Sequence, residues 1–114
     1  MNLPNADGVE IAKEKITDYL LNPLHPDGAG KAAFFAAMGF TLEQWDVLAD
    51  ALRALALTSP VANEVNSPHG AKYVVDGALT TPIGKTPSVR TVWIIDQAAD
   101  TPRLVTAYPC GKGD

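Results

Sequence analysis

Apolar side chains in the first half of the chain recur at the spacing of amphipathic helices. The apolar positions Ile16, Tyr19 and Leu20, spaced three and four apart, predict a helix over about Ala12–Leu21. Residues 22–30 hold two prolines and two glycines, so that helix cannot continue through them. The preceding segment, Gly8–Ile11, is either a short strand or an irregular lead-in to the helix.

Two further helices are predicted before residue 60. One covers about Lys31–Met38 and stops at Gly39, a residue favoured immediately after a helix. The next covers about Leu42–Leu57 and carries a Trp and Leu stripe on one face. Thr41 precedes it as a candidate N-cap, and Gln44 three residues later completes the pattern of a capping box.

The pattern changes after Thr58, where β-branched residues and turn dipeptides replace the helical spacing. Strands are predicted over about Val61–Asn66, Ala71–Thr80, Ser88–Asp96 and Arg103–Tyr108. Because the connections between them are short, successive strands should pair antiparallel as hairpins. The fold class is therefore α+β, with about three N-terminal helices packed on a four-stranded antiparallel β-meander.

The length of 114 residues predicts a single domain, 1–114, with a helical half 1–58, a β-sheet half 59–109 and a short tail 110–114. No apolar run approaches the roughly 18 residues of a membrane helix, and the first residues lack a signal-peptide pattern. The single Cys110 precludes an internal disulfide or a multi-cysteine metal site. We therefore expect a cytoplasmic protein without membrane, metal or cofactor, although a fragment of a larger exported chain would look the same.

The charge balance limits the kinds of partner. Nine basic against 13 acidic residues give a net charge of −4, and the acidic excess lies in residues 1–60. Nucleic-acid surfaces normally carry a basic excess, so any RNA site here must be a local cluster. The chain also shows no DNA-binding motif. An acidic surface, in turn, suits a basic protein partner.

Two candidate functional groups lie at the break after the first helix, one within it and one just after it. His25 lies in a stiff Pro-Leu-His-Pro loop, and its side chain can take up and release a proton near neutrality. The alternative is a surface histidine making a local hydrogen bond. Lys31 opens the second helix, where free N–H groups and the helix dipole favour an anion. The alternative is a solvated lysine, and the Gly-Lys-Ser/Thr of a P-loop is absent.

Arg90 and Thr91 fall inside the clearest strand, Ser88–Asp96. An arginine among apolar strand residues could bind a phosphate with two parallel hydrogen bonds. It could equally pair with Asp76 or Asp96 across the sheet. Thr91 is a candidate substrate-binding residue.

The last strand carries two more candidates. Thr106 and Tyr108 share a face because side chains alternate along a strand. Both could orient a phosphate or a base, and the tyrosine also offers a stacking surface. The alternative for Tyr108 is a half-buried residue at a strand end.

The other distinctive side chains have simpler structural interpretations. His69 is expected to be a turn residue, Arg103 a structural residue, and the two tryptophans, Trp45 and Trp93, part of the core. Cys110 has no visible activating partner and is assigned no role.

Several short segments stand out together: Asp18–Pro23, His25-Pro26, Lys31–Phe35 with Gly39-Phe40, Val89–Trp93 and Leu104–Pro109. With these segments the chain resembles a family of small, uncharacterised bacterial domains that also occurs near toxin-type modules.

The order of helices and then four strands, ending in Thr-Ala-Tyr-Pro, also resembles the barnase/EndoU/colicin/RelE class of toxin ribonucleases. That resemblance implies RNA cleavage without a metal or other cofactor. It implies His25 on the helical side and Thr106 and Tyr108 on the last strand, with Lys31 and Arg90 as further members of the catalytic set.

The sequence therefore favours a metal-independent endoribonuclease of toxin type, with RNA as substrate and an inhibitory protein as partner. His25 would take the proton of a ribose 2′-hydroxyl, and Lys31 and Arg90 would stabilise the charged phosphate. Thr106 and Tyr108 would position phosphate or base. The alternatives are a non-enzymatic binding module, antitoxin- or immunity-like, and a domain derived from a longer chain without activity of its own.

Overall fold

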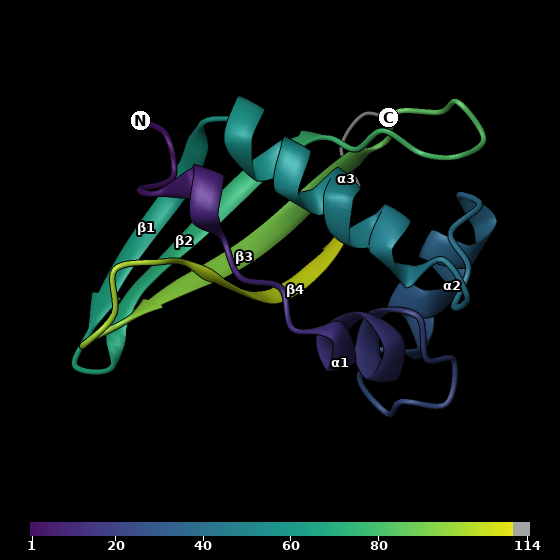
Figure 1. Ribbon diagram of the computed structural model, residues 1–114, viewed down its shortest axis with the longest axis horizontal. Coiled ribbons are helices and arrows are strands. Elements are labelled where there is room, and N and C mark those ends of the chain that lie inside the picture. Colours follow the sequence, from purple (N-terminus) through teal and green to yellow (C-terminus); the bar gives the residue numbers. More distant parts are fainter. Residues whose placement is uncertain (111–114) are drawn as a thin grey trace.

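The computed structural model describes residues 1–110 and places helical segments before a four-stranded sheet (Figure 1). The helical segments are η1 (Ala6–Gly8), α1 (Lys13–Lys15), the π-helical η2 (Ile16–Leu20), α2 (Ala29–Ala37) and α3 (Trp45–Thr58). The strands are β1 (Val61–Ser67), β2 (Gly70–Ala78), β3 (Ser88–Asp96) and β4 (Arg103–Pro109). The α+β prediction is confirmed. Residues 111–114, most of the expected tail, lie outside the described residues.

The sheet has the predicted meander topology. Its strand order is β1-β2-β3-β4, and every neighbouring pair is antiparallel. β3 has the predicted bounds, and the other strands differ from the prediction by two residues or fewer at each end. Two register shifts interrupt the ladder, one between Val61 and Asn63 and one opposite Val92/Trp93.

The first predicted helix is only partly α-helical. α1 is a single turn, and the chain continues as the π-helix η2, in which the Leu21 N–H donates to the Ile16 carbonyl at 2.8 Å. The predicted helix is therefore present over Lys13–Leu20, but the spacing of apolar residues does not distinguish these two helix types.

The other two helices form, with shifted starts. α2 begins two residues earlier than predicted and ends before Gly39, which has the positive φ of 95° expected after a helix. α3 begins at Trp45 rather than Leu42. The Thr41 hydroxyl does accept the Gln44 N–H at 3.2 Å, but this bond holds a turn that precedes the helix.

One face of the sheet packs against α3, which lies across it in Figure 1. This core face includes Tyr73, Val75, Val89 and Trp93, all at most 6% exposed. The sheet lies close to the end of α3 at Gly77, where an added Cβ would lie 3.2 Å from the Leu55 side chain and would clash with that of Ser59, just beyond the helix. We call the opposite face the outer face, and it carries the polar side chains described below.

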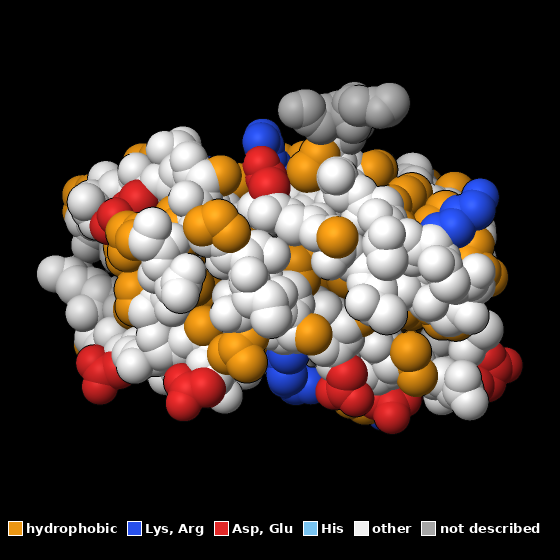
Figure 2. Space-filling model, turned by 90° about the horizontal axis from the view of Figure 1, so that it is seen from above, with side chains coloured by type: hydrophobic (Ala, Val, Ile, Leu, Met, Phe, Trp, Pro, Cys, Tyr) orange, Lys and Arg blue, Asp and Glu red, His pale blue; other side chains and the backbone are white. Residues whose placement is uncertain are grey.

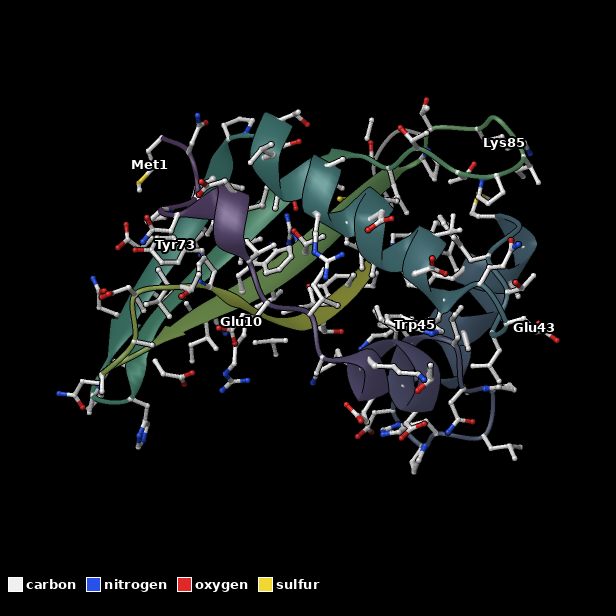
Figure 3. All side chains as sticks on the ribbon, in the orientation of Figure 1. Met1, Glu10, Glu43, Trp45, Tyr73 and Lys85 are labelled. Carbon is white, nitrogen blue, oxygen red and sulfur yellow. The ribbon has the colours of Figure 1, made fainter. Side chains whose placement is uncertain are left out.

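The core joins the helical and strand halves. Its fully buried side chains include Trp93 from the sheet, Leu48 and Leu52 from α3, and Phe35 from α2. The prediction for Trp93 is thus confirmed. Trp45 packs against the core but stays half-buried near α1, with the Lys13 ammonium 5.4 Å from its ring (Figure 3).

The segment before α1 is the irregular lead-in allowed by the sequence. Glu10 forms an isolated parallel bridge with Arg103, so this segment runs beside the start of β4 (Figure 3). α1 and α2 also contact β4. α1, η2 and α2 therefore gather at the β4 side of the sheet, where the candidate site lies.

The surface seen from above carries scattered hydrophobic side chains, with separate acidic side chains along its edges (Figure 2). Within residues 1–110, no helix combines the length and apolar character needed to cross a membrane.

Candidate functional site

The turn after η2 folds the chain back over Tyr19. Asn22 holds its start, since its side-chain oxygen accepts the Leu24 N–H at 2.9 Å and its side-chain nitrogen donates to the Asp18 carbonyl at 3.1 Å. Its end closes at Gly28, where an added Cβ would lie 2.6 Å from the Tyr19 carbonyl oxygen. The absence of a side chain at Gly28 thus lets this turn close on η2.

Tyr19 is the centre of the cluster that results. Its hydroxyl lies 3.0 Å from the Thr106 hydroxyl on β4, and the Lys31 ammonium donates a hydrogen bond to it. The His25 ring meets the Tyr19 ring edge-on, with ring centroids 4.9 Å apart. A π-helix, a loop, an α-helix and a strand therefore each contribute one polar side chain to the same place.

Two lysines surround this phenol with positive charge. The Lys31 nitrogen lies 4.8 Å from the centre of the Tyr19 ring and 5.7 Å from that of Tyr108, so it sits between two aromatic rings. Lys15 lies 5.3 Å from the Tyr19 ring. Such contacts hold an ammonium group in place without neutralising it.

The pKa of Tyr19 reflects these neighbours. Burial acts to raise the pKa of the phenol. The hydrogen bonds with Lys31 and Thr106 oppose burial, and the positive charges of Lys31 and Lys15 add to their effect. The net result is a pKa of Tyr19 below its ordinary value of 10.0.

His25 is half-buried and oriented by its own loop. Its Nδ1 accepts the backbone N–H of Asp27 at 3.0 Å. In the neutral ring the proton is then on Nε2, which makes that atom a hydrogen-bond donor.

A cleft of about 640 Å³ opens beside the cluster. Its walls come from α1, η2, the following turn and β4, and they are lined by Ala12, Glu14, Lys15, Asp18, Tyr19, His25, Asp27, Val105 and Thr106. The cleft therefore offers a cation, a phenol, an imidazole and carboxylates to one ligand.

Arg90 lies on β3, the strand next to β4, and its side chain is on the outer face. Its Nε and Nη2 each donate to a carboxylate oxygen of Asp76 at 2.8 Å, which is one of the two pairings considered from the sequence. Asp96, the other candidate, pairs with Arg103. The hydrogen bonds and charge of Asp76 raise the pKa of Arg90, with a smaller contribution from its cross-strand neighbour Tyr108.

Thr91 lies on the core face and is fully buried. Its hydroxyl donates to the Val75 carbonyl at 2.9 Å and accepts the Trp93 indole N–H at 2.8 Å. This geometry gives Thr91 two internal partners and no access to the cleft, so we do not include it in the candidate site.

The structure thus brings four of the sequence candidates together around Tyr19. These are His25, Lys31, Thr106 and Tyr108, and Arg90 borders the group through Tyr108. Sequence reasoning missed Tyr19 and Lys15. For Tyr19 the signal available was its place in the Asp18–Pro23 segment, but its spacing marked it as part of an apolar stripe, and Lys15 carried no such signal.

The remaining candidates lie elsewhere. His69 occupies the β1–β2 turn, as expected, and its carbonyl accepts the Gln97 N–H at 3.1 Å. The Cys110 N–H donates to the Ser88 carbonyl at 3.1 Å and so extends the β3–β4 pairing. Within the part of the chain that is described, no three His, Cys, Asp or Glu side chains gather as a metal site.

The fold and the cluster define a small α+β domain whose N-terminal helical segments close a polar cleft against the last strand of an antiparallel sheet. Residues 2–111 match a family described as "Domain of unknown function (DUF6883)", and the chain belongs to that family. A comparison with curated proteins found no match.

A similar fold occurs in a solved chain from a contact-dependent growth inhibition toxin–immunity protein complex of Klebsiella pneumoniae 342. The two chains are 12% identical, and they superpose with a TM-score of 0.70 over 91% of this chain and 95% of the other. At that identity the likeness concerns the fold.

Proposed function

We propose that this chain is a metal-independent endoribonuclease of bacterial toxin type, acting on RNA in the cytoplasm. The observation that carries the proposal is the meeting of Tyr19 and Thr106 at the wall of a cleft that also holds His25, with Lys31 hydrogen-bonded to the Tyr19 hydroxyl. The proposal is also supported by the fold that this chain shares with a chain of a toxin–immunity protein complex.

In the proposed reaction, a ribose 2′-hydroxyl loses its proton to a base of the protein and attacks the adjacent phosphate. The bond to the next 5′-oxygen breaks, and that oxygen takes up a proton from solvent. The products are a 2′,3′-cyclic phosphate and a 5′-hydroxyl end. Lys31 stabilises the negative charge that develops on the phosphate, the electrostatic effect that is often the largest in catalysis. Arg90, which is paired with Asp76, presents further N–H donors on the far side of Tyr108, and Thr106 and Tyr108 position the phosphate or a base.

The hydrogen bond to His25 changes the role expected for that residue. Proton removal by His25 would require Nδ1 to release the Asp27 N–H, because that bond places the ring proton on Nε2. Tyr19 can take the 2′-hydroxyl proton as the phenolate, and its lowered pKa, which results from the hydrogen bonds and charge of its neighbours, favours this form. We therefore assign proton removal to Tyr19 and a hydrogen bond from Nε2 to the substrate to His25.

The first experiment is inducible expression in bacteria of the wild type, Tyr19→Phe and His25→Ala, scoring growth and the integrity of total RNA. The expected result is growth arrest with RNA fragmentation for the wild type, neither for Tyr19→Phe, and a reduced effect for His25→Ala.

The chain supplies matched controls for both substitutions. Tyr73→Phe removes a phenol hydroxyl from the core face, and His69→Ala removes an imidazole from a turn; neither residue lines the cleft. Both controls should behave as the wild type. Purified wild type that leaves RNA intact, or Tyr19→Phe that cleaves as well as wild type, contradicts the assignment.

The second candidate function is a non-enzymatic binding module, antitoxin- or immunity-like. The net charge of −4 and the acidic first half favour it, since a toxin that binds RNA presents a basic surface. Normal growth with intact RNA supports this function, and co-purification then identifies the partner. If the chain is toxic instead, we expect a cognate inhibitor protein to cover the cleft.

A further inference from the structure

A second hollow lies on the outer face, at the end of the sheet where β2 ends and β3 begins. Its volume is about 320 Å³, and its walls come from β2, β3 and the end of β4. They are lined by Asp76, Gly77, Ala78, Ser88, Arg90 and Cys110. The mechanism proposed above uses this hollow only through Arg90.

The two hollows lie along one strand. Thr106 lines the cleft and Cys110 lines the second hollow, and Tyr108 stands between them on the same face. Four residues of extended strand span roughly 13 Å. The Lys31 ammonium, which lies against the Tyr108 ring, therefore also stands between the two hollows.

The second hollow offers fixed hydrogen-bonding groups. Arg90 is oriented by its two bonds to Asp76, and a guanidinium has five N–H donors, so further donors can meet a ligand. Its side chain is 42% exposed. Ser88 is exposed and adds a hydroxyl. Oriented guanidinium and hydroxyl donors beside an aromatic ring suit the acceptor edge and the flat face of a nucleobase.

We propose that the hollow bounded by Asp76, Ser88 and Arg90 is the subsite for the nucleotide on the 3′ side of the scissile phosphate. This inference rests on the proposed ribonuclease function, which fixes the direction of the strand. Tyr19 takes the 2′-hydroxyl proton at the cleft, so the attacking ribose lies there and the departing nucleotide lies beyond Tyr108.

The test compares chimeric oligonucleotides that contain one ribonucleotide in a DNA strand. The residue 3′ to the cleavage site carries each of the four bases in turn, or no base. Ala78→Trp fills the hollow without altering the ion pair, and Ala62→Trp on the exposed β1 edge is the matched control. Binding of the all-deoxy strand, measured by fluorescence anisotropy, provides a readout independent of cleavage.

Removal of the 3′ base should lower kcat/KM of the wild type and of Ala62→Trp by about tenfold or more. Ala78→Trp should have this lower kcat/KM even with the complete strand, and removal of the base should not lower it further. Two results would show that the subsite is wrong while the ribonuclease function stands. In one, the wild type cleaves and base removal leaves its kcat/KM unchanged; in the other, base removal lowers kcat/KM of Ala78→Trp as much as that of the wild type.

If neither the wild type nor any variant cleaves, the ribonuclease function is wrong. Binding of the all-deoxy strand then tests whether the hollow is a nucleotide site. Weaker binding of the all-deoxy strand by Ala78→Trp than by Ala62→Trp then supports a nucleotide site there. Equal binding, or none, overturns it.

Discussion

The hydroxyl of Tyr19 lies 3.0 Å from the hydroxyl of Thr106, 87 positions later in the chain. This contact joins the π-helix η2 to the last strand and places both groups at the wall of the cleft. With Lys31 as a second partner, Tyr19 has a pKa below its ordinary value, and that shift can be measured without any substrate.

Titration of the three tyrosines should separate Tyr19 from Tyr73. The pKa of Tyr19 is lowered, whereas burial, followed by the charge and hydrogen bond of Glu64, raises that of Tyr73. Ultraviolet absorbance should therefore show a phenolate phase below pH 10 that is missing in Tyr19→Phe and retained in Tyr73→Phe. An early phase that survives in Tyr19→Phe would disprove the assignment.

The same shift has a consequence for stability. Because Tyr19 loses its proton more readily in the folded chain than in the unfolded one, its ionisation favours folding. The stabilisation is complete above the ordinary value of 10.0 and is lost as the pH falls through the folded pKa. Urea unfolding across this interval should thus show a rise in stability of wild type relative to Tyr19→Phe, and a constant difference would count against it.

Lys31→Met should abolish most RNA cleavage while leaving the chain folded. The substitution keeps an unbranched side chain between the two aromatic rings but removes the ammonium that faces Tyr19. We expect a loss in kcat of about 100-fold, the scale for removing one donor from a developing negative charge. Lys85→Met, in the exposed β2–β3 loop, is the control. Equal activity of the two variants would contradict the role of Lys31.

Thr91→Val should cost stability and leave cleavage per folded molecule unchanged. The substitution keeps the shape of the side chain but leaves the Val75 carbonyl and the Trp93 indole N–H without their partner in the core. The free energy of unfolding in urea should fall by about 1–3 kcal/mol. Thr80→Val at an exposed position should change it little. A variant that is stable but fails to cleave would instead return Thr91 to the site.

The sheet was predictable because its information is local. β-branched residues and the flanking turn residues define β3 to the residue, and short connections imply the meander. The π-helix and the late start of α3 were not predictable. The π-helix shares its apolar spacing with an α-helix, and the Thr41 bond to Gln44 closes an isolated turn as readily as it caps a helix.

The residues of the candidate site also divide into those that the sequence could predict and those that it could not. His25, Lys31, Thr106 and Tyr108 could be chosen by residue type and position, since each has a polar group in the loop after the first helix, at a helix start or on the last strand. Tyr19 could not, because a tyrosine in an apolar stripe has the pattern of a core residue. Its polar partners are defined only when η2, α2 and β4 pack together.

Gly28→Ala should disturb the site from a position that carries no functional group. Its Cβ would lie 2.6 Å from the Tyr19 carbonyl, so the 22–28 turn and η2 must separate. We expect a loss of stability of about 1–3 kcal/mol and a pKa of Tyr19 closer to its ordinary value.

Gly30→Ala is the matched control, because an added Cβ there meets nothing within 4 Å and the position lies inside α2. It should stabilise the chain by about 0.5–1 kcal/mol, since alanine favours a helix over glycine. Both effects are measured by urea unfolding and by tyrosine titration. Should Gly28→Ala leave the early phenolate phase in place, the close approach of the turn to η2 is not what positions Tyr19.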